Sequence, residues 1–175
     1  DTPTPTPPPA DLKSKISKQD VAGKEIAKAE LTLTSLDGYD MSGVTLIQGN
    51  KTIYPKVSAD KMSISYETVD TSQSEVIGLR AGRYRLTETV TSKQYLTADA
   101  IEFELKDDGS FDCRGKIYIA GSPIVMVDKA DPTYKSENDS SEHKPLPATG
   151  EELGITTIIG VIIIGFAVAL LTGFG

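Results

Sequence analysis

Three ionisable residues, Lys18, Glu88 and Asp128, lie in short segments where apolar and polar side chains alternate. Each has the same parity as large apolar neighbours, which are Ile16 in the first segment, Tyr84, Leu86 and Val90 in the second, and Ile124 and Met126 in the third. Because successive side chains of a β-strand point to opposite faces, this parity predicts that all three groups point inward. Lys13 and Lys15 have the opposite parity and are expected to point outward.

An amine and two carboxyl groups that meet in an apolar interior have two chemical fates. If they do not react, they form a buried salt bridge, or they lie at strand ends in contact with water, since an unpaired buried charge is costly. They can also react, because burial favours the neutral amine of a lysine, which is nucleophilic, and the protonated carboxyl group of an aspartate, which is electrophilic. A glutamate beside them can hydrogen-bond the carboxyl group and carry the proton as an amide forms. The residues alone leave both alternatives open.

The segments that position these residues are expected to be β-strands. Period-two alternation recurs at residues 31–34, 84–90 and 101–105, and helical spacing is not sustained between residues 11 and 130. Turn signals interrupt the alternation at Asp37-Gly38, Gly49-Asn50, Ala81-Gly82 and Asp108-Gly109. About seven short strands in roughly 120 residues predict an all-β fold, an antiparallel sandwich of immunoglobulin-like size.

Composition and charge exclude several classes of function. The chain has 175 residues, room for one ordinary domain with appendages, and a net charge of −7. Because lysine and arginine form no dense basic face, nucleic acid is not expected as a partner. The single cysteine, Cys113, excludes an intrachain disulfide, and we expect a half-buried, inert thiol. The sequence starts at Asp1 without a signal-peptide pattern, so an export signal is expected further upstream.

Two polar segments and one apolar segment flank the predicted domain, which we place at residues 11–130. Residues 1–10 are half proline and are expected to form an extended linker. Residues 131–145 are polar and charged, which is typical of a solvated linker that can cross a cell wall. No charged residue occurs from Leu153 to Gly175. This apolar segment is long enough to cross a bilayer core of about 30 Å as a transmembrane helix.

The apolar segment is preceded by the residues Leu146, Pro147, Ala148, Thr149 and Gly150. This pairing resembles the LPxTG sorting signal of Gram-positive wall-anchored proteins and covers residues 146–175. Proline keeps its neighbourhood extended, so that a transpeptidase cleft can accept the segment as a strand. The resemblance implies membrane insertion before sorting, cleavage after Thr149 by a sortase, and transfer to a peptidoglycan precursor or a pilin lysine. It therefore implies a cell-surface protein that is attached covalently to the wall.

A second resemblance covers most of the predicted domain. Residues 16–33 (ISKQDVAGKEIAKAELTL), 84–89 (YRLTET) and 124–130 (IVMVDKA) together resemble a collagen-adhesin B-type (Cna B, SpaA-like) domain, in the same order. The last segment is also similar to the reactive peptide of the fibronectin-binding-protein domain that was split to make the SpyTag pair. The resemblance implies a prealbumin-like β-sandwich, in which a lysine of the first strand joins covalently to an Asn or Asp of the last strand.

Carried over to this sequence, the isopeptide bond joins Lys18 to Asp128, and Glu88 assists its formation. After Glu88 the sequence TVTSKQY replaces the Pro-x-Gly-Tyr turn that often follows this glutamate in the family, and only Tyr95 is kept. The bond would close a loop of about 110 residues. By the chain-entropy argument used for disulfides, it would stabilise the domain by roughly 4–5 kcal/mol.

These features favour a structural module, a stalk or pilin-type unit, over an enzyme. No cofactor or metal site is expected, since the only histidine, His143, falls in a linker and no glycine-rich phosphate loop is present. Two alternatives stay open: an adhesin domain that binds a host extracellular-matrix protein, and a wall tether for an enzyme upstream. Residues 53–56 (IYPK) resemble a pilin motif whose lysine accepts a neighbour's sorting signal, although Lys56 is also explained as a strand-end lysine.

Overall fold

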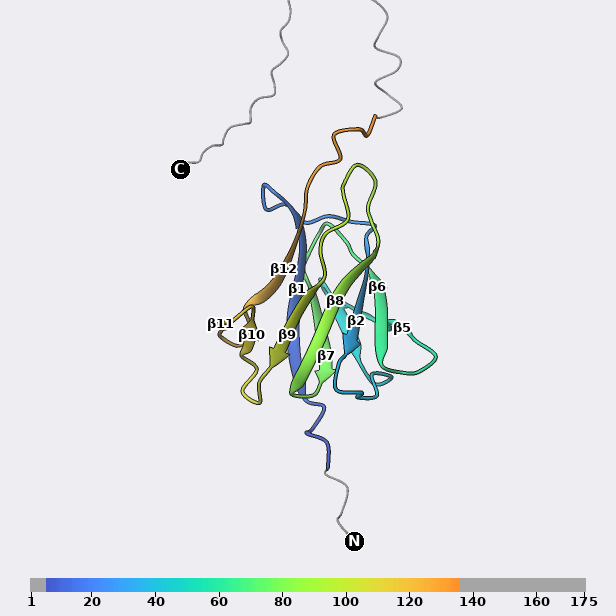
Figure 1. The fold of residues 1–175 in the computed structure, drawn as a ribbon. Coiled ribbons are helices and arrows are strands. Elements are labelled where there is room, and N and C mark those ends of the chain that lie inside the picture. Colours follow the sequence, from blue (N-terminus) through green and yellow to red (C-terminus); the bar gives the residue numbers. More distant parts are fainter. Residues whose placement is uncertain (1–5, 136–175) are drawn as a thin grey trace, which may run out of the picture. The chain divides into compact units, whose positions relative to one another are not determined.

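The computed structural model describes residues 6–135, which form a β-sandwich (Figure 1). Within this range no helix occurs that is long and apolar enough to cross a membrane. The sorting motif and the predicted transmembrane segment, residues 146–175, lie outside the described residues. The strands are β1 (Leu12–Asp20), β2 (Glu30–Ser35), β3 (Thr45–Gln48), β4 (Lys51–Ile53), β5 (Lys56–Val57), β6 (Ser63–Glu67), β7 (Ser74–Leu79), β8 (Gly82–Val90), β9 (Ile101–Leu105), β10 (Phe111–Cys113), β11 (Lys116–Tyr118) and β12 (Pro123–Asp128).

The strands form two sheets. The five-stranded sheet has the order β12-β1-β7-β3-β4, and the seven-stranded sheet has the order β11-β10-β9-β8-β2-β6-β5. The predicted all-β sandwich is confirmed, with more strands than the seven or so expected, because several strands have only two or three residues. The pairing of β1 with β12 is parallel, whereas the other strand pairs of the two sheets are antiparallel. The first and last strands therefore run side by side in the same direction.

The alternation seen in the sequence becomes the core of the sandwich. In β9, Ile101, Phe103 and Leu105 are buried and the two glutamates between them are exposed. In β2, Leu31 and Leu33 are fully buried. Burying an aliphatic or aromatic side chain of this size contributes about 1.5–3 kcal/mol. The core is therefore the main source of stability and fixes which face of each strand points inward.

One residue of β8 departs from the expected parity. Val90 was predicted to point inward with Glu88, but its side chain is exposed. The register between β8 and β2 pairs Glu88 with Leu31 and Val90 with Glu30, so that Thr89 is an extra residue. Such a bulge shifts the parity of the strand beyond it. Glu88 is consequently the last inward-facing residue of β8.

The chain enters the sandwich at one end and leaves it at the other (Figure 1). This follows from the parallel pairing, since β1 is the first strand and β12 is the last. Before β1, the carbonyl oxygen of Pro8 accepts a hydrogen bond from the guanidinium group of Arg80. After β12, residues 129–131 contact the loop between β8 and β9. Both connecting segments are thus fastened to the domain.

Candidate functional site

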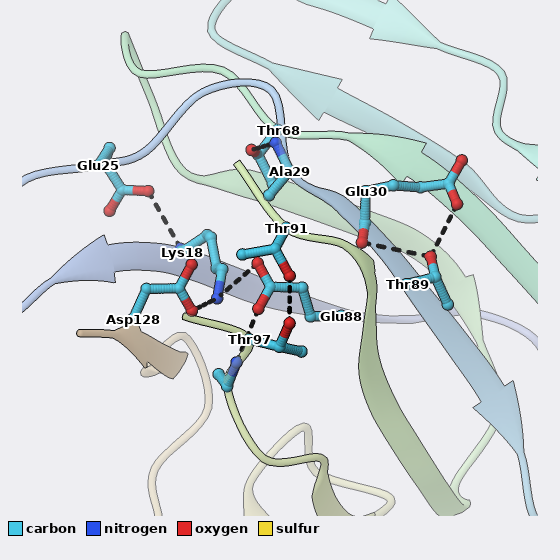
Figure 2. A network of polar contacts seen from close by, with 11 residues as sticks. Lys18, Glu25, Ala29, Glu30, Thr68, Glu88, Thr89, Thr91, Thr97 and Asp128 are labelled. Carbon is cyan, nitrogen blue, oxygen red and sulfur yellow. Dashed lines mark hydrogen bonds and ion pairs between the residues drawn. The ribbon is translucent and has the colours of Figure 1, made fainter. Parts of the chain in front are cut away.

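The three predicted residues meet at the end of the sandwich where the chain leaves. Lys18 lies near the end of β1, and Asp128 is the last residue of the neighbouring strand β12. The parallel register pairs Lys18 with Met126 and Asp20 with Asp128, so Asp128 lies one inward position further along its strand. Glu88 reaches the same point from β8 in the other sheet, and Figure 2 shows the three side chains together.

The geometry places the amine between two carboxyl groups. Lys18 Nζ donates a hydrogen bond to Asp128 Oδ1 in direct contact and lies 3.2 Å from Glu88 Oε2. The side chain of Lys18 is 1% exposed, and those of Glu88 and Asp128 are 0% exposed. The inward orientation predicted for all three residues is therefore confirmed. Lys13 and Lys15 are exposed, as their parity predicted.

The surroundings of these groups are apolar. The next inward residues along the three strands are Ile16 in β1, Met126 in β12 and Leu86 in β8, and all are buried. In such an environment charges interact strongly and an uncompensated charge is costly. Two carboxylates and one ammonium would leave one negative charge in excess. One proton on a carboxyl group removes that excess.

Glu88 is the carboxyl group whose pKa is raised. Its burial raises the pKa, a backbone hydrogen bond from Ala98 and the charge of Lys18 lower it, and the nearby carboxyl group of Asp128 raises it. The N–H of Ala98 donates to Glu88 Oε1 at 2.8 Å. Within residues 6–135, neither Glu88 Oε2 nor Asp128 Oδ2 has a hydrogen-bond partner, although the first is within ion-pair distance of Lys18. A proton shared between the two carboxyl groups would satisfy both oxygens.

Two residues that support the site were not identified from the sequence. Ala98 acts through its backbone N–H, so its side chain carries no signal of the role. Glu25 accepts hydrogen bonds from the hydroxyl group of Ser17 and, at 3.3 Å, from the backbone N–H of Lys18. It comes from the loop after β1, where nothing in the local alternation marks it. Together these contacts hold the backbone of Lys18 and the carboxyl group of Glu88.

The other residues considered in the sequence lie away from this cluster. Cys113 is half-buried on β10, as expected. Lys56 is exposed at the start of β5, an edge strand, and Tyr54 is also exposed. Among residues 6–135, no group of His, Cys, Asp and Glu side chains could hold a metal ion.

Comparison with known families shows which class of domain this β-sandwich is. The sequence model of the SpaA prealbumin-like fold domain matches residues 13–116, and the chain belongs to this family. The match includes Lys18 and Glu88 and ends before Asp128. No curated protein matches the chain.

Similar solved structures include proteins of bacterial pili. One is the pilus-presented adhesin Spy0125 (Cpa), with 21% identity and a TM-score of 0.41 over 63% of this chain and 21% of that chain. Another is a C-terminal fragment of the pilus adhesin SpaC from Lactobacillus rhamnosus GG, with 16% identity and a TM-score of 0.46 over 72% and 47%. A third is the full-length major pilin SpaD from Corynebacterium diphtheriae, with 15% identity and a TM-score of 0.44 over 69% and 30%. The chain thus spans about a fifth of the length of the first of these proteins.

Proposed function

We propose that this chain is a module of a Gram-positive surface protein, a stalk or pilin-type unit, whose domain crosslinks itself through an amide between Lys18 and Asp128. The observation that carries the proposal is the direct contact between the amine and the carboxyl group in an interior that excludes water. Reacting atoms held in contact gain the advantage of an intramolecular reaction, which can lower a barrier by about 7–11 kcal/mol. The reaction is a single self-directed turnover without a separate substrate.

The proposed reaction balances without a cofactor. Glu88 takes a proton from the Lys18 ammonium and passes it to the Asp128 carboxylate, and the neutral amine then attacks Cγ of the protonated carboxyl group. A C–N bond forms and a C–O bond breaks, so that one carboxyl oxygen leaves. Glu88 then carries a second proton from the attacking nitrogen to the hydroxyl leaving group, which departs as water. The products are an amide and one water molecule, made from one ammonium group and one carboxylate.

Intact-mass spectrometry of the folded chain tests the reaction. The wild-type chain is expected to be lighter than its sequence by one water, and digestion should yield a peptide that joins the Lys18 and Asp128 regions. Lys18→Ala and Asp128→Ala should restore the full mass, and Glu88→Ala should slow or stop the loss of water. Lys15→Ala, in the same strand but exposed, is the matched control and should crosslink normally. A wild-type chain at its full sequence mass would leave only a buried ion pair.

The same proposal assigns a role to the residues on either side of the domain. Residues 1–10 and 131–145 serve as linkers, and residues 146–175 serve as the sorting signal that a sortase cleaves after Thr149. The acceptor is an amine of the peptidoglycan precursor or a pilin lysine, which leaves the module at the cell surface. Incubation with a sortase and an amine acceptor should release residues 150–175. Processing that is equal in wild type and Thr149→Ala would contradict this assignment.

A further inference from the structure

The loop between β8 and β9 folds into a turn beside the site. The backbone N–H of Tyr95 donates to the carbonyl oxygen of Ser92 at 3.3 Å, and Gln94 has a positive φ of 70°. The hydroxyl groups of Thr91 and Thr97 contact each other across the base of the loop, close to Glu88 in Figure 2. A non-glycine residue with positive φ is uncommon and marks a conformation that its surroundings maintain.

The surroundings that maintain this turn are the residues that follow β12. The N–H of Leu96 donates to the carbonyl oxygen of Lys129 at 2.8 Å, and the N–H of Asp131 donates to the carbonyl oxygen of Gln94 at 2.8 Å. Between these two bonds, Tyr95 and Ala130 form an antiparallel bridge. The loop and the departing chain are therefore paired like two short strands.

The pairing of the loop with the departing chain connects the carboxyl groups of Glu88 and Asp128 through backbone hydrogen bonds. Lys129 follows Asp128 directly, and Leu96 is two residues before Ala98, whose N–H donates to Glu88 Oε1 at 2.8 Å. With Oε1 held in this way, Oε2 is the oxygen that faces Lys18 at 3.2 Å. The position of Glu88 thus depends on a hydrogen bond that the chain after Asp128 keeps in place.

We propose that residues 94–98 and 129–131 form a backbone clamp that positions Glu88 for the crosslinking reaction. The clamp rests on the proposed function and adds a condition to it. Glu88 is held in position only after β12 has docked and the chain beyond it has paired with the loop. The clamp therefore delays the proton transfer until the last strand is in its native register. The residues of the clamp are positioning residues, because they act through Glu88.

The test is a time course of crosslinking by the full chain during cell-free synthesis. Samples are quenched in denaturant at intervals, and intact mass gives the fraction that has lost water. Leu96→Pro removes the N–H that bonds Lys129, whereas Leu96→Ala removes the side chain and keeps the N–H. Because misplacing a catalytic group by about 1 Å can cost 10²-fold, we expect Leu96→Pro to react roughly 10–100-fold more slowly and Leu96→Ala to react at the wild-type rate.

A pH profile separates positioning of Glu88 from a general loss of structure. The groups that face Glu88 are Lys18 from β1 and Asp128 from β12. The hydrogen bond from Ala98 lowers the pKa of Glu88, so its removal in Ala98→Pro should raise that pKa. Since Glu88 must be ionised to accept the first proton, the acidic limb of the rate profile should move to higher pH. Ala98→Ser keeps the N–H and should leave the limb unchanged.

A second pair of variants keeps the proposal testable if the proline variants unfold. Glycine adopts the positive φ of Gln94 readily and a β-branched residue does not, so Gln94→Gly should react normally and Gln94→Val several-fold more slowly. Equal rates for Leu96→Pro and Leu96→Ala, or for the two Gln94 variants, would overturn the clamp while leaving the crosslink intact. A wild-type chain that never loses water would overturn the proposed function and the clamp with it.

Discussion

The two faces of β8 place similar charges in opposite environments. On the outer face, Arg85 pairs with Glu102 at 2.6 Å, and both side chains are about half exposed. On the inner face, Glu88 lies 3.2 Å from Lys18, and both side chains are buried. Exposed pairs contribute about 0–1 kcal/mol, whereas removing one partner of a buried pair costs about 3–5 kcal/mol. Side-chain parity along one strand therefore separates a charge that lies at the surface from one that is buried beside an opposite charge.

The largest expected effect comes from removing the buried amine. Lys18→Ala should lower the free energy of unfolding by at least the roughly 4–5 kcal/mol attributed to closing the loop with an amide, because the crosslink can no longer form. Thermal unfolding of the full chain, followed by circular dichroism, measures the change. Lys15→Ala on the outer face of the same strand is the control. A Lys18→Ala variant as stable as Lys15→Ala would contradict the difference between the two faces.

An intermediate effect is expected in the pH dependence of stability. Burial raises the pKa of Glu88 above its usual value of 4.5, so the folded state holds this proton more tightly than the unfolded state. The stability that Glu88 contributes is therefore fully present below about pH 4.5 and is lost as the pH rises through the folded pKa, by up to about 1.4 kcal/mol per pH unit. Urea unfolding between pH 4.5 and 7 should show this slope in wild type and not in Glu88→Gln.

The exposed carboxyl groups provide the contrast in the same experiment. Hydrogen bonds from the backbone and side chain of Arg83 lower the pKa of Asp37 below 3.8. The stability from this group is present above that value and is lost only as the pH falls through the lowered pKa. Its contribution therefore lies outside the window of Glu88. A slope between pH 4.5 and 7 that persists in Glu88→Gln would show that another group is responsible.

The smallest effect on stability is expected for the ion pair on the outer face of β8. In a double-mutant cycle, Arg85→Ala and Glu102→Ala should show a coupling of less than about 1 kcal/mol. This coupling should shrink further in 1 M salt, where the screening length is about 3 Å. Chemical denaturation with urea at two salt concentrations gives the values. A coupling above about 2 kcal/mol that salt does not reduce would mean that solvent exposure is not what separates the two faces.

Much of the fold and the location of the site could be predicted from the alternation of side chains. Leu31, Leu33 and Phe103 are buried as their parity indicated, and the inward positions of Lys18 and Asp128 followed from the same rule. This rule is local, since it needs only the period of the strand. The role of these residues in an amide bond stays a prediction.

The features that sequence reasoning missed depend on pairing between distant segments. The bulge at Thr89, which exposes Val90, arises from the register between β8 and β2. The parallel alignment of β1 and β12 is likewise set by which strands become neighbours. Ala98 contributes a backbone N–H that any residue except proline could supply, so its identity carries no information about its contact with Glu88. Local period and composition do not encode such contacts.

The parallel pairing of the first and last strands has a mechanical consequence. Tension that enters through β1 reaches Lys18 near the far end of that strand, and with the proposed amide in place it passes directly to Asp128 and out of the domain. The two residues are 110 positions apart, and all the chain between them stays outside the path of the force. At about 3.3–3.6 Å per residue, this keeps roughly 360–400 Å of contour length from being pulled out. A stalk made of such units would keep its length in flowing liquid, since the stretched path contains covalent bonds alone.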